Sequence, residues 1–305
     1  MEQPKANRIQ KAIGKRFRKI ITNSPDGTPP WLEEVGQGED AGLFLPSDAP
    51  WVVHGDLATL IGGIRALLMQ ALHPGTLSGV ATHSRYEQDP LGRLAGTTKW
   101  LTVTTFGSLS AIDGEAGRVN KMHSVVKGEY KNAQGEKVSY QASDFDLLLW
   151  VHIAFTASFL KTHQLYSRKP IPGGADRYVS LWSKSVTRLG LEKCPLAEQQ
   201  LNNAIKNFYD SNQLLANETT FKVIKFLKNP PLPKVARIVY ALLFQAAAAS
   251  IEKEYLELLK IKALPLWFVK PITHSLLWAM AKAIGSESPL ETAAKNRLVR
   301  IGAWS

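Results

Sequence analysis

The sequence predicts an all-α protein with about nine to twelve helices, packed as a bundle or in a globin-like arrangement. Apolar residues recur every three or four positions in segment after segment, as they do on the buried face of a helix. Proline and glycine signals separate these segments, and no clear run of alternating apolar and polar residues interrupts them. The one exception is the polar stretch 131–143, where Gln134 and Gly135 indicate a turn and at most one small hairpin.

The chain is long enough to bury a sizeable core. It has 305 residues, of which 45% are hydrophobic and 21% are charged, as in ordinary globular proteins. It contains no internal repeat and no low-complexity tract. We therefore divide it into a basic N-terminal helix with a Pro/Gly-rich loop, residues 1–50, and a single helical domain, residues 51–305.

The first 23 residues form a basic amphipathic segment, in which seven Lys and Arg residues stand against a single acid, Glu2. Ile9, Ile13, Phe17 and Ile20 fall on one stripe of a helix. A basic helix with one apolar stripe is typical of membrane interfaces. The alternatives are a helix that packs this stripe on the body of the protein and an organellar transit peptide.

The net charge of +11 favours anionic partners. The sequence carries no nucleic-acid-binding motif and no run of aromatic residues interleaved with basic ones. We therefore expect peripheral contact of the basic N-terminus with a membrane surface, and no nucleic-acid partner.

Residues 24–50 are rich in proline, glycine and acidic residues, and we expect them to form a loop. A long helix follows, because Asp56 can cap its start and apolar residues recur at helical spacing over 57–72. His73 and Pro74 end it, since proline disfavours helix in the residue before it.

A second apolar helix is expected over 93–106, and it stops at Gly107. The next begins near Asp113 and ends at Gly128, and a long apolar helix then runs over 144–163. Further helices are expected around 175–190, 197–214, 216–228, 233–260 and 270–284.

Several enzyme classes lose support because their motifs are absent. Cys194 is the single cysteine, which excludes disulfide scaffolds and C-x-x-C metal sites. No histidines pair as H-x-x-x-H, and the P-loop, G-x-G-x-x-G and G-x-S-x-G patterns are missing. There is no apolar leader and no run of about 18 apolar residues, so we expect a cytoplasmic protein with at most peripheral membrane contact.

His123 has the strongest physical case for a ligand role. It falls with Val119, Met122 and Val126 on one apolar stripe of the helix expected over 113–128. A neutral imidazole directed into an apolar pocket is what an axial ligand of haem iron requires. The alternative is a core histidine whose hydrogen bonds are satisfied, which is the more frequent role of a lone histidine.

Three other residues are candidates for a pocket. His152 shares an apolar helix face with Leu148 and Phe155, and it has the same two interpretations, ligand or core. Arg93 and Thr97 stand four residues apart and therefore share a helix face, where they could hold an anionic or oxygen ligand. The alternative is an arginine whose stem covers apolar surface and a threonine bonded to its own helix.

The remaining candidates are weaker. Cys194 is interpreted either as a thiolate ligand of haem or, preferably, as an inert half-buried thiol. His73 and His83 are interpreted as loop anchors.

Segments that carry these residues resemble a known family when taken together. They are 65–75 (RALLMQALHPG), 83–86 (HSRY), 89–98 (DPLGRLAGTT), 105–107 (TFG), 119–128 (VNKMHSVVKG) and 147–152 (LLLWVH). Their joint order and spacing resemble the family of latex-clearing proteins (rubber oxygenases) and mycophenolic-acid-pathway oxygenases. The resemblance covers 51–245.

The resemblance implies a helical fold around a haem pocket that holds haem b without a covalent bond. His123 would ligate the iron, and Arg93 and Thr97 would lie on the distal side, where they hydrogen-bond dioxygen or water. The other residues expected to bind the cofactor are Val119, Met122, Val126 and His152.

The chain departs from the family pattern in two respects. Some rubber oxygenases place a lysine just before the threonine as a second axial ligand, whereas this chain has Gly96. They also place arginines three residues before and four after the histidine, whereas this chain has Asn120 and Lys127. We therefore expect no lysine ligation at this position.

The sequence thus predicts a haem-b-dependent oxygenase that uses dioxygen on a small apolar substrate, isoprenoid or lipid-like, by oxidative cleavage of a C=C bond. Arg93 and Thr97 are the expected catalytic residues. One alternative is a non-catalytic helical protein that binds a lipid or haem at a membrane surface, and another is a mono-oxygenase or peroxidase with the same haem.

Overall fold

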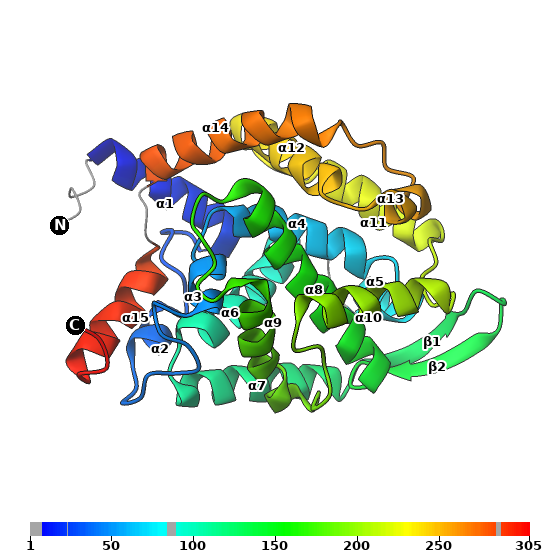
Figure 1. Cartoon of the computed structure of the whole chain (residues 1–305), viewed down its shortest axis with the longest axis horizontal. Coiled ribbons are helices and arrows are strands. Elements are labelled where there is room, and N and C mark those ends of the chain that lie inside the picture. The colour runs from blue at the N-terminus through cyan, green and yellow to red at the C-terminus, as the bar shows by residue number, and fades with distance from the viewer. Residues whose placement is uncertain (1–7, 23, 84–89, 285–287) are drawn as a thin grey trace.

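The computed structural model confirms an all-α protein with one small hairpin (Figure 1). It describes residues 8–22, 24–83, 90–284 and 288–305. Over these ranges the protein has fifteen α-helices, and β1 and β2 pair as a two-stranded antiparallel hairpin.

The α-helices of the described residues are α1 (Arg8–Thr22), α2 (Leu32–Gly36), α3 (Ala49–His54), α4 (Ala58–Gln70), α5 (Pro74–His83), α6 (Pro90–Phe106), α7 (Leu109–His123), α8 (Phe145–Tyr166), α9 (Gly174–Trp182), α10 (Glu198–Asp210), α11 (Glu218–Lys228), α12 (Lys234–Ala249), α13 (Lys253–Leu259), α14 (Leu266–Ile284) and α15 (Pro289–Arg300). The strands are β1 (Lys127–Lys131) and β2 (Lys137–Gln141), and two short 3₁₀ turns are η1 (Ser183–Ser185) and η2 (Thr187–Leu189). The count exceeds the expected nine to twelve, because α2, α3, α5 and α15 were not expected and the expected helix over 233–260 divides into α12 and α13.

The centre of the fold is the pair α4 and α8, which pack against each other along their length. They approach closely because Gly62 of α4 has no side chain. A Cβ atom there would lie 2.6 Å from Phe159 Cδ1 and 2.8 Å from Thr162 Oγ1 of α8. Among the described helices only α8 is long and apolar enough to cross a membrane, and 61% of its apolar window is buried against other helices. It serves as the core helix of this domain.

A buried histidine joins further helices to this pair. His54 of α3 has its Nδ1 2.8 Å from Thr105 Oγ1 of α6 and its Nε2 2.9 Å from Tyr178 Oη of α9. Its ring meets that of Phe159 on α8 edge-on, with 5.2 Å between centroids. Burial lowers the pKa of His54 to about 3, so the ring is neutral and both of its nitrogens are satisfied.

Helices α6 and α7 form an antiparallel pair joined by the two-residue link Gly107 and Ser108. Ser108 caps α7, because its side chain accepts a hydrogen bond from the Ala111 N–H. Across the pair, Lys99 Nζ lies 3.4 Å from the buried Glu115 carboxylate. This ion pair fixes how the two helices are aligned.

The Pro/Gly-rich N-terminal stretch is packed against the C-terminal helix α15, which the sequence analysis did not predict. Trp31, Trp51 and the apolar face of α15 share a second, smaller core. The buried Arg297 of α15 donates hydrogen bonds to Val35 O at 2.6 Å and to Phe106 O at 2.9 Å. A single side chain therefore connects α15, α2 and the end of α6.

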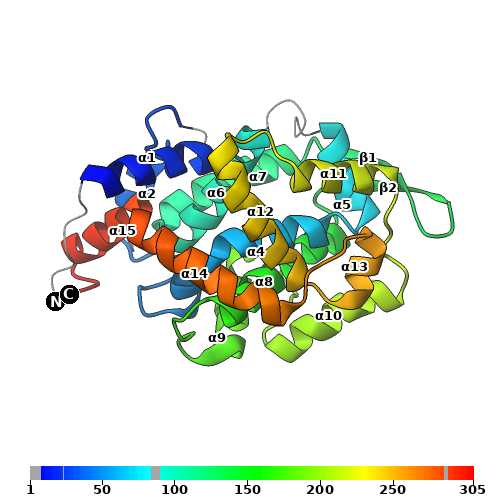
Figure 2. The same ribbon diagram turned by 90° about the horizontal axis from the view of Figure 1, so that it is seen from above.

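Helices α1, α12 and α14 lie side by side on one side of the molecule (Figure 2). Helix α1 lies against α6 and α14, and Phe17 and Ile20 of its expected apolar stripe are half-buried. Ile13 of that stripe remains 41% exposed.

One position at which the sequence predicts only the end of a helix is also the start of the next helix. The sequence predicts that His73 and Pro74 end a helix, but Pro74 is also the first residue of α5. Proline suits this position because its missing N–H would have no partner there. His73 Nδ1 accepts a hydrogen bond from the Gly75 N–H at 3.2 Å, and burial lowers the pKa of His73 to about 4. The ring anchors the start of α5 as a neutral acceptor.

Candidate functional site

His123 is the last residue of α7, and its side chain is half-buried. Burial, and then the positive charge of Arg118, lower the pKa of the imidazole. The ring is therefore neutral at neutral pH, which is the form that can ligate a metal ion.

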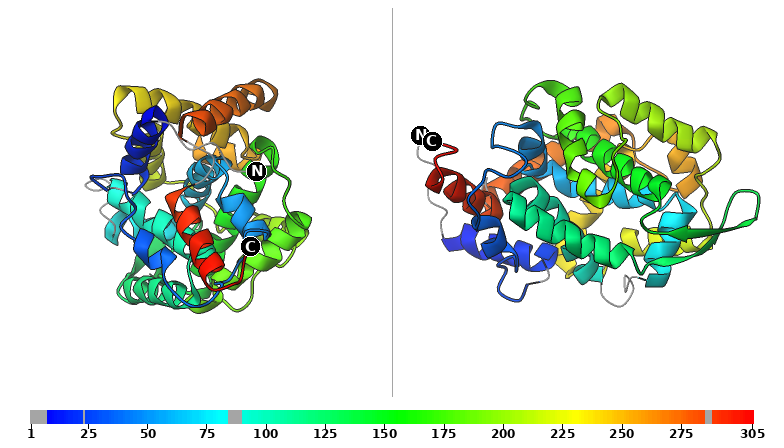
Figure 3. Two further views of the ribbon diagram at one scale, coloured as in Figure 1. Left: turned by 90° about the vertical axis from the view of Figure 1, so that its left-hand side faces the viewer. Right: turned by 90° about the horizontal axis from the view of Figure 1, so that it is seen from below.

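The α6–α7 pair carries His123 away from the link between the two helices. Lys99 and Glu115 meet across the antiparallel pair, so one helix runs from there back to the first turn of α6 and the other runs on to His123. Arg93 belongs to that turn, but its side chain lies outside the described residues. Thr97 follows one turn later and is half-buried. Figure 3 shows, from below, α7 leading to this end of the molecule and into the β1–β2 hairpin.

The helix that carries His123 ends earlier than expected. The prediction that it continues to Gly128 is wrong, because Val126 O accepts a hydrogen bond from the Ala142 N–H at 2.9 Å and the chain turns into β1. Val126 therefore lies in the turn after α7 and shares no helical face with His123.

The apolar residues expected beside His123 have different environments. Val119 is 7% exposed and packs against the body, whereas Met122 is 47% exposed. Val126 is half-buried. A Cβ atom on Gly79 of α5 would lie 3.5 Å from Val126 Cγ1, so α5 borders the region just after His123.

His152 lies in α8 with only 4% of its surface exposed. Burial lowers its pKa to about 4, so this ring is also neutral. Its Nε2 atom is buried and has no hydrogen-bond partner among the described residues. A buried polar atom without a partner is costly, and therefore marks a place where a bound group would be stabilising.

Tyr140 of β2 is a second such side chain, and it was not predicted from the sequence. The residue is 4% exposed, and its hydroxyl group is buried without a partner in the described part of the chain. A Cβ atom on Gly79 would lie 3.7 Å from this hydroxyl, so Tyr140 and Val126 border the same stretch of α5. No sequence signal marks Tyr140, because the hairpin register that pairs it with Gly128 places it here.

Helix α5 connects the two parts of this region. It packs against β1, which follows His123, and against α8, which carries His152. At its start, a Cβ atom on Gly75 would lie 3.0 Å from Leu147 Cδ2 of α8 and 2.9 Å from Tyr130 Cε1 of β1. His83 is the last residue of α5, and its side chain lies outside the described residues. The segment 84–89 also lies outside them.

Space is open beside α6. A Cβ atom on Gly96 would meet no heavy atom within 4 Å. This is the position at which some rubber oxygenases have a lysine. The neighbouring Thr97 lies in the same helix, one turn after Arg93.

Cys194, His163 and His274 have other environments. Burial raises the pKa of the half-buried Cys194, so its sulfur is a protonated thiol. His163 Nε2 lies 2.9 Å from Lys169 O, and His274 Nε2 lies 3.1 Å from Leu165 O. These are structural contacts.

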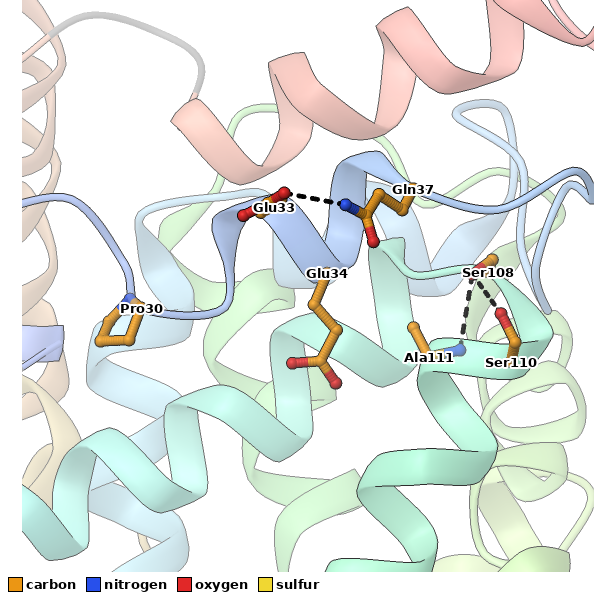
Figure 4. A pocket seen from close by; sticks show the side chains of 7 residues that line it. All are labelled: Pro30, Glu33, Glu34, Gln37, Ser108, Ser110 and Ala111. Carbon is orange, nitrogen blue, oxygen red and sulfur yellow. Dashed lines mark hydrogen bonds between the residues drawn. The ribbon is translucent and has the colours of Figure 1, made fainter.

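Two surface hollows lie elsewhere. One, of about 520 Å³, is open to solvent between α2 and the start of α7 and is lined by Glu33, Glu34, Gln37 and Ser108 (Figure 4). The other, of about 410 Å³, lies between the end of α8 and the start of α9. His123, Thr97 and His152 line neither of them, and the polar walls of the first do not suit an apolar ligand.

The neutral imidazole of His123 is the kind of ligand that a haem held by one histidine requires. A porphyrin itself supplies four ligands to iron, so one neutral imidazole suffices from the protein. In the described ranges no three His, Cys, Asp or Glu side chains gather around a possible metal site. Among the described residues, the His152 Nε2 atom and the Tyr140 hydroxyl are buried without a partner, and a Cβ atom on Gly96 would meet open space.

Comparison with known proteins gives one match. A family model described as "ER-bound oxygenase mpaB/B'/Rubber oxygenase, catalytic domain" matches residues 51–284. No curated protein and no solved structure matches the chain.

Proposed function

The chain belongs to the family of mpaB and rubber oxygenase catalytic domains, and on this premise we propose that it is a haem-b-dependent oxygenase acting on a small apolar substrate. The family match extends over most of the helical domain and supports an oxygenase. The observation that carries the proposal of haem is His123, a half-buried and neutral imidazole at the end of α7.

His123 would hold the iron from one side. Its depressed pKa keeps the nitrogen lone pair of the ring available at neutral pH. When bound, haem would supply the activation of dioxygen and the redox chemistry.

Residues of α6 and α8 would supply the polar contacts. Arg93 and Thr97 would donate hydrogen bonds on the distal side, where they orient oxygen or water. His152 would gain a partner for its buried Nε2 atom, either a polar group of the cofactor or a bound water. Tyr140, beside Val126, would gain one for its hydroxyl group.

The proposed substrate class is apolar, isoprenoid or lipid-like, and the reaction is oxidative cleavage of a C=C bond. Apolar, partly buried residues of α6 and α8, such as Leu101 and Phe155, support this class. Apolar walls hold such a substrate and exclude water.

Haem uptake tests the proposal. Protein expressed with ample haem should show a Soret absorption band, and His123→Ala should lose it. External imidazole should restore the band in His123→Ala, because it can occupy the place of the missing ring. His152→Ala serves as the matched variant and should retain the iron ligand. If His123→Ala keeps its haem while His152→Ala loses it, the ligand assignment is wrong.

The second candidate function is a non-catalytic helical protein that binds a lipid or haem. Oxygen consumption separates the two, since a binding protein with a normal Soret band would consume no dioxygen with any prenylated compound. A folded wild-type protein without a Soret band would contradict the oxygenase proposal itself.

A further inference from the structure

One side of the molecule combines exposed aromatic residues with positive charge. We define the α1–α12–α14 face as the outward surfaces of these three helices, which lie side by side in Figure 2. The opposite side of each helix packs on the body, so the outward surfaces have no partner in the described protein.

The outward surface of α14 is strongly apolar. Trp267 is 78% exposed, Trp278 is 59% exposed and Phe268 is 45% exposed. A soluble protein rarely presents two tryptophans this openly on one helix, because each withholds a large apolar area from the core.

The exposed tryptophans follow from the helical geometry of α14. Val269, Thr273 and Leu277 recur every four residues and are buried against the body. Trp267 and Trp278 lie about half a turn away from this buried stripe, so they point outward. The neighbouring α12 continues the apolar surface with Ile238, which is 66% exposed.

The charge of the face has one sign. Helix α1 contains six Lys and Arg residues, α12 contains two and α14 contains two, and none of the three helices contains Asp or Glu. Lys15, Arg16 and Lys19 of α1 are exposed, as are Lys234 and Arg237 of α12. The basic residues therefore border the apolar ones.

We propose that the α1–α12–α14 face binds the surface of a bilayer that contains anionic lipids. Tryptophan rings settle at the headgroup boundary, where their apolar body and their N–H group are both accommodated. Lysine and arginine beside them gain from the negative surface potential of the leaflet. The two requirements of an interfacial protein, apolar anchors and adjacent cations, are met on one face.

A second copy of the chain is the competing occupant, and charge disfavours it. In a two-fold dimer the same patch meets itself, so the cations of α1 and α12 would face those of the partner copy. An anionic bilayer neutralises the same charges.

Vesicle flotation tests the proposal on the full chain, with or without haem. Vesicles of phosphatidylcholine alone are compared with vesicles that contain about 30% phosphatidylglycerol. We expect the protein to float with the anionic vesicles at about 0.05 M KCl and to be released at about 0.5 M KCl, where the Debye length is much shorter. The tryptophan emission should shift to shorter wavelength on binding.

Matched variants test whether vesicle binding depends on this face or on the rest of the surface. Trp267→Ser with Trp278→Ser should lower the partition coefficient at least about tenfold. Trp304→Ser should leave it unchanged, because Trp304 is 37% exposed and lies outside the face. Each variant is checked for its helical circular dichroism.

The contribution of the basic residues is tested with two double variants that change the net charge by the same amount. Lys15→Glu with Lys19→Glu should abolish flotation, and Lys184→Glu with Lys193→Glu, at exposed positions outside the face, should not. No flotation of the wild type, equal binding to neutral vesicles, or full binding by the Trp267 and Trp278 variant would overturn the proposal. The proposal would also be overturned if light scattering showed that the wild type is a dimer which the Trp267 and Trp278 variant disperses, and the wild type did not bind vesicles. None of these outcomes bears on haem uptake, so the oxygenase proposal is tested independently.

Discussion

Arg65 Nη2 lies 2.8 Å from Glu252 Oε2, in an ion pair whose partners differ in burial. The Arg65 side chain is 3% exposed and the Glu252 side chain is 40% exposed. The same guanidinium donates to Ser158 Oγ at 3.0 Å, so it connects α4 to α8 and to the turn before α13. The carboxylate is thus the counter-charge of a cation that water hardly reaches.

Removing this carboxylate should therefore cost more than a surface ion pair is worth. We expect Glu252→Gln to lower the free energy of unfolding by about 1–3 kcal/mol, because it leaves a buried charge uncompensated. In an Arg65→Met background the same change should cost close to nothing. Urea denaturation of the four proteins gives the coupling energy. An equal cost of Glu252→Gln in both backgrounds would show that the pair is energetically unimportant.

The stability of the protein should fall in mild acid. Burial depresses the pKa of His54 to about 3, and those of His73 and His152 to about 4. Between pH 6.5 and 4 the unfolded chain binds protons that these folded rings do not bind, so the free energy of unfolding decreases as the pH falls. About three protons should be taken up on unfolding near pH 5.

Denaturation with urea between pH 5 and 8 measures this proton uptake. His152→Gln should make the dependence on pH shallower by about one proton, since it removes one of the depressed groups. A variant whose slope equals that of the wild type would contradict the assignment of His152 as a neutral buried ring.

Replacing either of two adjacent glycines of α4 by alanine should change the stability of the protein, in opposite directions at the two positions. Gly62→Ala would place a Cβ atom 2.6 Å from Phe159 Cδ1 and 3.2 Å from Phe159 Cα, so α4 and α8 must separate. We expect it to cost about 1–3 kcal/mol, as overpacking does. Gly63→Ala meets no atom within 4 Å and should stabilise the protein by about 0.5–1 kcal/mol through helix propensity. Thermal unfolding of the two variants compares them directly, and a stable Gly62→Ala protein would mean that the helices are not in close contact.

Tyr140→Phe should stabilise the haem-free protein. The substitution removes a buried hydroxyl group that has no partner among the described residues, which is worth about 1 kcal/mol. If the hydroxyl serves a bound group, the same variant should bind haem more weakly. Unfolding of the haem-free protein and haem titration supply the two readouts. A loss of stability without haem would show that the hydroxyl already has a partner.

The general fold could be predicted from the sequence because helical periodicity and Pro/Gly signals act locally. The α8 helix and the turn at Gly135, where φ is +80°, were both expected. Pro74 shows the limit of such signals, since the same residue ends one helix and begins another. The helix α15 was not expected, because its few buried residues, such as Leu298, have meaning only against a distant N-terminal segment.

The candidate site was predictable only in part. Motif order singled out His123 as the predicted ligand, and the structure places it as the last residue of α7. It could not reveal that Val126 leaves the helix, because the competing hydrogen bond comes from Ala142 across a hairpin. The burial of Tyr140 was not predicted for a related reason, since it depends on the register of the two strands. The roles of Arg93 and Thr97 stay predictions.

The link at Gly107 and Ser108 has a consequence for how the family domain can vary. Asp40 holds this link, since its Oδ1 accepts a hydrogen bond from the Leu109 N–H at 2.8 Å. His123 stands at the opposite end of α7, so a residue added within the helix, with its start held at this link, would turn the ring by about 100° around the helix axis and displace it by about 1.5 Å. The orientation of the imidazole therefore depends on the residue at which α7 begins, some four turns away.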